Sequence, residues 1–294
     1  MPCPPDVLLL ALWPLKRAGA RLIYDQHDLV PELYLSRFGG AGPLYHAARW
    51  LERVSYSLAD VVIATNESYR AVAVARGRKA PEDVFVVRSG PDLGRFRLVE
   101  PDESLKRGRR YLLGYLGVMG PQDGVDHALR ALAELRRRRD DWHAILIGEG
   151  DVWPEMKALA AELGLQDAVE FTGRIPDEDV LRILSTADVC LAPDPKNPLN
   201  DVSTMNKILE YMAMGRPLVS YDLKEARVSA GGAAAYAAPN DEKSFADCIE
   251  ALLDDPERRV AMGALGRERV QNGLSWEHSK RALLAAYARA AAAA

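Results

Sequence analysis

The stretch STMNKILEYMAMG, residues 203–215, places a lysine and a glutamate in a segment otherwise rich in methionine, leucine and isoleucine. On a helix, Ser203, Lys207 and Glu210 share one face. The first N–H groups of a helix lack internal partners and carry the positive end of its dipole, so they can hold a phosphate. Lys207 would add a positive charge beside a diphosphate, and Glu210 could accept hydrogen bonds from ribose hydroxyls. The alternative is a capped surface helix with an ordinary Lys/Glu pair.

Ligands of parallel α/β sheets lie beyond the carboxyl ends of the strands, so polar residues just after strands are candidates. Such segments are QHDLVPE (26–32), VMGPQDG (118–124), RIPDED (174–179) and DPKNPLNDVSTMNK (194–207). His27 is either a polar residue satisfied at a strand end or a functional group. Asp177 and Asp179 form a D-x-D pair of the kind that binds metals in some enzymes. They follow Pro176 at an expected helix start, where acids complement the dipole, so we favour a structural role and no metal site.

Short β-rich runs alternate with helical patterns along the chain, which predicts βαβ units and parallel sheets, an α/β fold. The expected strands are RLIYD (21–25), VVIAT (61–65), VFVVRS (84–89), YLLGYLG (111–117), HAILIG (143–148), VEFTG (169–173), VCLAP (189–193), PLVSYD (217–222) and AAYAA (234–238).

The two halves of the chain differ in how many strands they supply. The second half has six, enough for a complete doubly wound domain over residues 106–275. The first half, residues 1–105 including a polar linker, has three and begins on a helix, so we expect an incomplete domain that lacks roughly 60 to 90 upstream residues. A last helix at 276–294 is expected to pack back toward the first domain, and its N-cap is Ser275.

Composition excludes several classes of protein. The formal net charge of −4 and the sequence pI near 5.8 give no support to nucleic-acid binding. The three cysteines are far apart without CxxC spacing, which suits a reducing cytoplasm and packing roles. No apolar run reaches the length of a membrane span, and DVLLLALW (6–13) is expected to be a buried helix rather than an export signal.

Several blocks, taken together and in order, resemble the retaining family-four glycosyltransferases of the GT-B fold (glycosyl transferases group 1), which have two Rossmann-like domains facing each other across a cleft. The blocks are YDQHDLVPE, RSGPDLGRF, GYLGVMGPQDGVDHALRAL, IGEGD, VEFTGRIPDEDV, STADVCLAPD and MNKILEYMAMGRPLVSYD. The resemblance covers nearly the whole chain and implies transfer from a nucleoside diphosphate sugar, with no metal or other cofactor.

The resemblance assigns roles to residues of the 194–207 segment and the helix after it. The family's ribose-binding glutamate corresponds to Glu210, and its partner eight positions earlier falls on Val202, with Asp201 adjacent. The family's diphosphate-binding arginine and lysine fall on Val118 and Asp123, so neither charge is present. We expect replacement by Lys207, with help from Lys196 and from the amides of Ser203, Thr204 and Met205.

Further roles follow from the same resemblance. His27 matches the histidine that contacts the transferred sugar near the scissile bond. Arg174 and Ile175 match the stretch whose backbone receives the base, and Gly117 and Gly148 let backbone approach the ligand.

The sequence therefore predicts a retaining glycosyltransferase of glycan or envelope polysaccharide synthesis, and the alternative is a noncatalytic nucleotide-sugar-binding remnant or scaffold. Expected partners are a nucleotide sugar donor and a glycan or lipid-linked acceptor. The expected location is the cytoplasm. Peripheral contact with the inner face of a membrane through the basic run Arg136 to Arg139 is an alternative, although such a run is typical of a solvated helix end. A bare sheet edge in the first domain would allow self-association.

Overall fold

The computed structural model describes residues 2–3 and 8–292, and they divide into two compact units. The first unit contains residues up to Gly90, a short insert at Asn197–Thr204 and the helix from Trp276 onward. The second unit contains Pro91–Lys196 and Met205–Ser275. The polar segment after Gly90, which the sequence analysis placed in the first domain as far as residue 105, thus belongs to the second unit.

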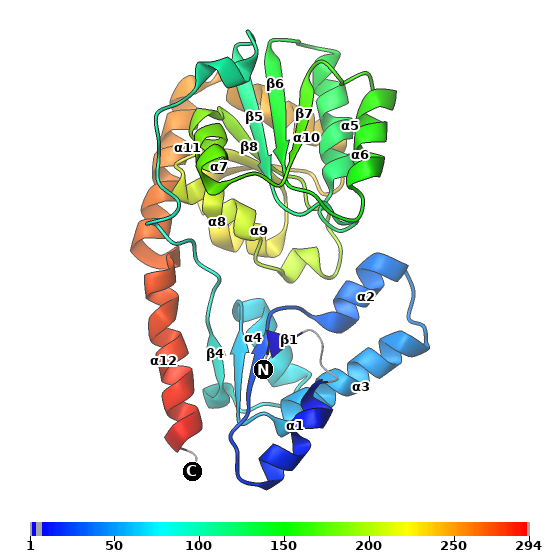
Figure 1. The fold of residues 1–294 in the computed structure, drawn as a ribbon, viewed down its shortest axis with the longest axis vertical. Helices are drawn as coiled ribbons and strands as arrows, with labels where there is room; N and C mark the ends of the chain where they lie inside the picture. The colour runs from blue at the N-terminus through cyan, green and yellow to red at the C-terminus, as the bar shows by residue number, and fades with distance from the viewer. Residues whose placement is uncertain (1, 4–7, 293–294) are drawn as a thin grey trace. The chain divides into compact units, whose positions relative to one another are not determined.

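The second unit is built on a parallel sheet with the strand order β10-β9-β8-β5-β6-β7 (Figure 1). Its strands are β5 (Tyr111–Leu116), β6 (Trp142–Ile147), β7 (Val169–Gly173), β8 (Val189–Ala192), β9 (Leu218–Tyr221) and β10 (Ala234–Ala237). Its helices are α5 (Val125–Arg136), α6 (Trp153–Glu162), α7 (Asp177–Thr186), α8 (Asn206–Ala213), α9 (Lys224–Ala230), α10 (Glu242–Asp254) and α11 (Pro256–Arg269). Shorter helical turns are η2 (Glu103–Lys106), η4 (Gly231–Ala233) and η5 (Val270–Leu274).

Helices cover both faces of this sheet because each strand is apolar on both sides. Leu113 and Tyr115 of β5 pack in the main core with residues of α5 and α10. Leu112 of β5 points to the other face, where it packs with Ile183 of α7. In Figure 1, α5 and α7 accordingly lie on opposite sides of the sheet.

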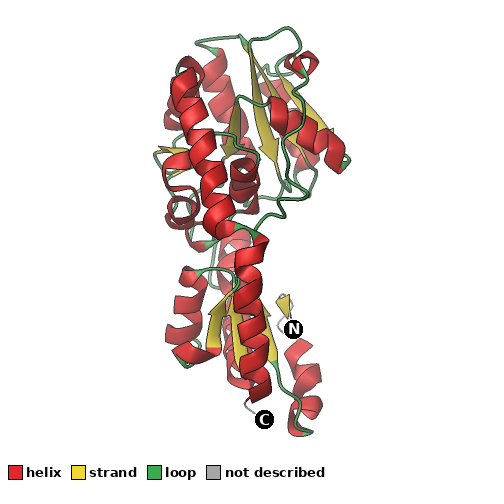
Figure 2. Cartoon of the chain, turned by 90° about the vertical axis from the view of Figure 1, so that its left-hand side faces the viewer, coloured by secondary structure: helices red, strands yellow, loops and turns green. Residues whose placement is uncertain are grey.

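The first unit holds a smaller parallel sheet with the order β1-β2-β3-β4. Its strands are β1 (Pro2–Cys3), β2 (Ile23–Gln26), β3 (Val61–Ala64) and β4 (Val84–Val86). Its helices are α1 (Leu8–Arg17), α2 (Val30–Phe38), α3 (Pro43–Leu58), α4 (Glu67–Ala75) and α12 (Trp276–Ala292), with short turns η1 (Pro81–Asp83) and η3 (Asn200–Val202). Figure 2 shows the strands in yellow between red helices.

The last helix, α12, packs on the sheet of the first unit. Its Ala286 and Ala290 are buried with Val61 and Ile63 of β3. Arg289 of α12 also forms an ion pair with Asp83, at 2.9 Å. The small side chains of Ala286 and Ala290 let the helix lie close to the strands.

All nine expected strands are present within three residues of the predicted ends, so the α/β prediction is confirmed. Two features of the first unit differ from expectation. The two-residue strand β1 pairs with β2 at an edge where no strand was predicted. The helix expected to be buried at 6–13 is α1, whose Trp13 and Leu15 are 44% and 55% exposed, while residues 6 and 7 lie outside the described residues.

Candidate active site

The strand order of the second unit reverses between β5 and β8, which is where doubly wound sheets bind ligands. These two strands are paired only at Leu113 with Val189 and at Gly114 with Cys190, so their carboxyl ends are not joined to each other by a continued ladder. We therefore expect a ligand site beyond the carboxyl ends of β5 and β8.

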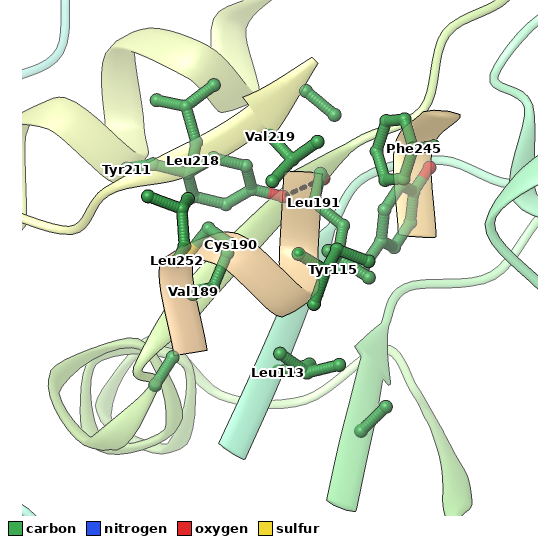
Figure 3. Close-up of a cluster of buried hydrophobic side chains, with 14 of the residues drawn as sticks. Leu113, Tyr115, Val189, Cys190, Leu191, Tyr211, Leu218, Val219, Phe245 and Leu252 are labelled. Carbon is green, nitrogen blue, oxygen red and sulfur yellow. Dashed lines mark hydrogen bonds between the residues drawn. The ribbon is translucent and has the colours of Figure 1, made fainter. Parts of the chain in front are cut away.

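Tyr211 of α8 bridges the two strands beyond their last ladder pair. Its hydroxyl accepts a hydrogen bond from the Leu116 N–H at 2.8 Å and donates to the Leu191 carbonyl at 3.0 Å. Figure 3 shows the second of these bonds among the surrounding buried side chains. The tyrosine thereby fixes α8 against the sheet, and with it Lys207, which lies one turn earlier on the same helix.

Lys207 is buried, with only 7% of the residue exposed, and it is surrounded by acidic and aromatic groups. Its Nζ donates to Asp194 Oδ1 at 2.6 Å, and Asp123 Oδ1 lies 3.8 Å away. The Tyr115 ring lies 5.3 Å from the same nitrogen. Asp194 directly follows Pro193 at the end of β8, whereas Asp123 belongs to the loop after β5, so the lysine joins both sides of the switch point.

The charge of Lys207 is secure despite its burial. Burial alone would lower the pKa of Lys207, but the Asp194 carboxylate, Tyr115 and Asp123 outweigh it and raise that pKa. The Asp194 carboxylate is only half satisfied, because its Oδ2 has no hydrogen-bond partner among the described residues. The site thus contains a permanent ammonium with a carboxylate that keeps unused acceptor capacity.

Glu210 lies on α8 one turn beyond Lys207 and is partly buried. Burial raises the pKa of its carboxyl, and the positive charges of Arg95 and Lys207 oppose this only in part. A carboxylate in such a position can accept hydrogen bonds from a pair of hydroxyl groups. Arg95 itself forms a two-armed ion pair with Asp177 at the start of α7, at 2.7 and 2.8 Å.

The loops after β5 and β6 are interlocked through backbone atoms. The Gly117 N–H donates to the Ile147 carbonyl and the Met119 N–H to the Glu149 carbonyl, both at 3.1 Å. Gly148 adopts φ +123°, and a Cβ there would lie 1.9 Å from the Gly117 carbonyl oxygen. A Cβ on Gly117 would in turn meet the Tyr115 hydroxyl at 2.9 Å. Both glycines therefore have a packing role, in which each makes room for its neighbours, and contact with a ligand stays a prediction for them.

The start of α8 differs from the expectation that the amides of Ser203, Thr204 and Met205 lead the helix. The helix begins at Asn206 with Met205 as its N-cap residue, and the Ser203 N–H already donates to the Asn200 carbonyl. The leading amides are thus those of Asn206 and Lys207. The reason is that residues 200–202 form a separate short turn that ends at Ser203.

The residues just before α8 are held by the first unit. The Ser203 hydroxyl lies 2.8 Å from the Tyr69 hydroxyl, and the Thr204 hydroxyl accepts a hydrogen bond from Asn66 at 3.0 Å. Asp201 is partly buried in the same insert. The Ser203 and Thr204 side chains thus have partners within the first unit, to which they belong.

His27 follows β2 in the first unit and its Nε2 lies 3.1 Å from Asp25 Oδ2. That hydrogen bond raises the pKa of His27, and about half of the side chain is exposed, so the ring can meet a ligand or solvent. A histidine oriented by a carboxylate can hold or donate a proton at its free nitrogen.

Three further predicted donor-binding residues follow β7 and β8. Arg174 is exposed after β7, and Ile175 packs with the apolar cluster beneath α7. The Lys196 N–H donates to Asn240 Oδ1 at 2.6 Å, and its Nζ lies 3.4 Å from the Asp222 carbonyl oxygen. The Lys196 Nζ therefore points toward the loop after β9.

The acidic D-x-D pair and the arginine run 136–139 both form ion pairs within the fold. Asp177 is paired with Arg95, and Asp179 is paired with Arg182 at 2.8 Å. No cluster of three metal-binding side chains occurs among the residues that the structure describes. Each arginine of the run 136–139 lies within ion-pair distance of a carboxylate, namely that of Asp167, Glu134, Asp247 with Glu250, and Asp141 with Asp254 in turn. This run therefore offers no uncompensated basic patch to a membrane.

Sequence reasoning missed Tyr115, Asp194 and Arg95 as neighbours of the candidate residues. Asp194 did carry a signal, because it directly follows the β8 run in a segment already singled out. Arg95 carried none, since its partner Asp177 is 82 positions away.

Comparison with known proteins gives this geometry a context. Residues 110–255 match the family model described as glycosyl transferases group 1. Alpha-D-kanosaminyltransferase of Streptomyces kanamyceticus is 32% identical over 155 residues, which cover 52% of this chain and 39% of that protein. Alpha-maltose-1-phosphate synthase of Mycolicibacterium smegmatis is 28% identical over 299 residues, covering 93% of this chain and 74% of that one. The chain spans well under two thirds of the first of these relatives.

Solved structures share the fold across nearly the whole chain. Sucrose-phosphate synthase from Thermosynechococcus elongatus superposes with a TM-score of 0.79 at 22% identity, covering 96% of this chain and 71% of that one. HepE of Anabaena, solved in complex with UDP, gives 0.77 at 18% identity and covers 96% and 75% of the two chains. The fold is thus of the GT-B type, with Rossmann-like parallel sheets. Of the helices that the structure describes, none is both long and apolar enough to cross a membrane.

Proposed function

We propose that this chain, whose residues 110–255 match the family model described as glycosyl transferases group 1, transfers a sugar from a nucleoside diphosphate sugar to a hydroxyl acceptor. The observation that carries the proposal is the buried, permanently charged Lys207 at the switch point between β5 and β8. A fixed cation at this place suits an anionic diphosphate, because ligands of such sheets bind beyond the carboxyl ends of the strands.

In this proposal the second unit binds the donor. Lys207 and the amides of Asn206 and Lys207 at the start of α8 face the diphosphate. Glu210 accepts hydrogen bonds from the ribose hydroxyls, and the backbone of Arg174 and Ile175 receives the base. HepE has been solved with UDP and with UDP-glucose, whereas relatives of this chain include GDP-mannose-dependent mannosyltransferases, so we leave the base and the sugar unassigned.

The proposed chemistry is displacement at the anomeric carbon with retention. The bond from that carbon to the diphosphate oxygen breaks, the acceptor hydroxyl oxygen bonds to the same face, and its proton passes to the leaving phosphate. Negative charge grows on the diphosphate in the transition state, where Lys207 and the helix amides stabilise it. His27 contacts the transferred sugar, and the mechanism calls for neither a protein nucleophile nor a metal.

The acceptor we propose is a glycan or a lipid-linked precursor on the cytoplasmic side. The name of one relative specifies a phosphatidylinositol monomannoside mannosyltransferase, and a structural neighbour, WaaG, is described as involved in lipopolysaccharide biosynthesis. Peripheral membrane contact and self-association remain parts of this proposal, without a contribution from the paired arginines 136–139.

A second candidate function is a nucleotide-sugar-binding module without catalysis. Its support is the acidic environment of Lys207, with Asp123 at 3.8 Å where related enzymes are expected to carry a lysine. Val118, at the expected position of their arginine, is 64% exposed and offers no charge.

One experiment tests the proposal and separates the two candidates. We expect a panel of UDP, GDP and ADP sugars to raise the Tm of the chain for at least one donor, because a ligand that binds only the folded state stabilises it by mass action. Release of nucleoside diphosphate on adding glycan acceptors indicates the transferase, and binding without release indicates the module. The variant Lys243→Met, which changes an exposed lysine of α10, serves as the control and should keep the same shift. If no donor in the panel raises the Tm, both candidates fail.

A further inference from the structure

Two carboxylates face the one buried ammonium at the switch point. Asp194 holds Lys207 at 2.6 Å, and Asp123 stands 3.8 Å from the same nitrogen. The Tyr115 hydroxyl donates to the Val118 carbonyl at 2.8 Å, so its proton is not used on either acid. Lys207 therefore contributes one formal positive charge to this cluster, and Asp194 and Asp123 contribute two formal negative charges.

Asp123 is fixed in place, although it lies on a loop. Its Oδ2 accepts a hydrogen bond from the Gly120 N–H at 3.0 Å, and its own N–H donates to the Gly120 carbonyl at 3.1 Å. Gly124, next in the chain, has φ +68° and lies so close to Pro193 that a Cβ would meet the Pro193 carbonyl oxygen at 2.2 Å. The loop is thereby held against the end of β8, and the Asp123 charge has a defined position.

Of the two acids, Asp123 is the one that an incoming ligand meets. Asp194 is 1% exposed and one of its oxygens is bound by Lys207. The side chain of Asp123 keeps 18% of its surface exposed, while its Oδ1 faces Lys207. Glu210 adds a further acid one turn along α8, where the positive charges of Arg95 and Lys207 act on it.

A carboxylate at this place should repel the free nucleoside diphosphate more strongly than the nucleoside diphosphate sugar, because the two ligands differ in charge. In a nucleoside diphosphate sugar both phosphates are esterified, and the group carries about two negative charges. The free nucleoside diphosphate ends in a monoester phosphate with a second pKa near 6, so it carries about three at neutral pH. A partly buried carboxylate repels that additional charge more strongly than it would in bulk water, and the exposed part of the Asp123 side chain leaves this repulsion open to screening by salt.

We propose that Asp123 is a specificity-determining residue that favours the intact donor over the free nucleoside diphosphate, so that the leaving group is expelled after transfer. The inference rests on the proposed function, because it takes the ligand to be a nucleoside diphosphate sugar bound beside Lys207. Lys207 supplies attraction to both ligands, and Asp123 sets the difference between them.

The test is the ratio of two dissociation constants, that of UDP over that of UDP-glucose, with the GDP/GDP-mannose and ADP/ADP-glucose pairs measured in parallel by calorimetry. In the isosteric variant Asp123→Asn we expect the diphosphate to tighten about tenfold more than the sugar ester, so the ratio falls about tenfold. The matched control is Asp126→Asn. Asp126 is the second residue of α5, three positions after Asp123, and it is paired with Arg130, so this variant should leave the ratio unchanged.

A second measurement uses the parent protein alone. Raising the salt from about 50 to about 500 mM shortens the Debye length severalfold and should lower the parent's ratio, whereas the ratio of Asp123→Asn should respond less. Equal tightening of both ligands in Asp123→Asn together with a salt-independent parent ratio overturns the inference and leaves the proposed function standing. Failure of every nucleotide pair to bind the parent and the folded variant overturns the proposed function, and the inference with it.

Discussion

At the scale of single residues, the defining feature is the buried ion pair between Lys207 and Asp194. Lys207 and Asp194 are both nearly inaccessible to solvent, and Tyr211 holds α8, the helix that carries Lys207, against the two central strands. Burying two charges costs desolvation energy that their attraction repays only when the geometry is good. The pair is thus a poor source of stability and a good means of keeping a cation at one fixed point.

This account predicts how the pair responds to mutation. Lys207→Met should lower the free energy of unfolding by about 3–5 kcal/mol, because it leaves the Asp194 carboxylate buried without a counter-charge. The double variant Lys207→Met/Asp194→Leu should recover most of that loss, since both buried charges are gone. Urea unfolding followed by circular dichroism measures the free energy of unfolding of the parent, the single variant and the double variant. A Lys207→Met protein as stable as Lys243→Met, whose change is on the surface, would contradict the burial argument.

At the scale of elements, the loops after β5 and β6 behave as one piece. Backbone hydrogen bonds join Gly117 to Ile147 and Met119 to Glu149, and the missing Cβ of Gly148 leaves room for the Gly117 carbonyl. The loop that carries Asp123 therefore takes its position from a neighbouring loop. The glycines of these loops permit this close backbone packing.

A matched pair of glycine substitutions tests this coupling. Gly148 and Gly164 both have positive φ, +123° and +68°, but only Gly148 has atoms within 4 Å of an added Cβ. Gly164→Ala should cost about 1–2 kcal/mol of unfolding free energy from backbone strain alone. Gly148→Ala should cost clearly more and also weaken donor binding severalfold, because the Gly117 carbonyl must move. Equal losses of stability with unchanged affinity, read from urea unfolding and calorimetry, would show that the loops are independent.

At the scale of the whole molecule, the two units differ in the size of their cores. The main core of the second unit takes its buried residues from Phe96 to Val270, whereas the first unit has a smaller cluster around Tyr24 and Tyr56 and another beneath α12. Stability follows buried apolar area, so the units should open with different free energies.

Native-state hydrogen exchange measures that difference directly. We expect amides of β5, β6 and β8 to exchange at least about tenfold more slowly than those of β2, β3 and β4, since the larger core must open as one unit. A saturating donor should slow exchange further in the loops after β5 and β8. Equal protection of residues 21–89 and 111–238 would argue against the asymmetry.

The sequence by itself determined the repeating strands, the α/β class and the helix that carries Lys207 and Glu210. These features depend on periods of two and of about four residues and on turn residues nearby, all of which are local in the chain. The same patterns did not show where α8 begins, because a separate turn at 200–202 interrupts the helical register. They also gave no sign of the exposure of Trp13 and Leu15, since an apolar run looks alike whether or not something covers it.

Only the tertiary structure decided what surrounds Lys207. Asp194 lies 13 positions before it, Asp123 comes from the loop after another strand, and Tyr115 comes from within that strand. A counter-charge is selected by distance through space, which packing sets, and no periodicity along the chain encodes it. The sequence therefore identified the cation of the candidate site, and the fold decided that it is buried and balanced by acids.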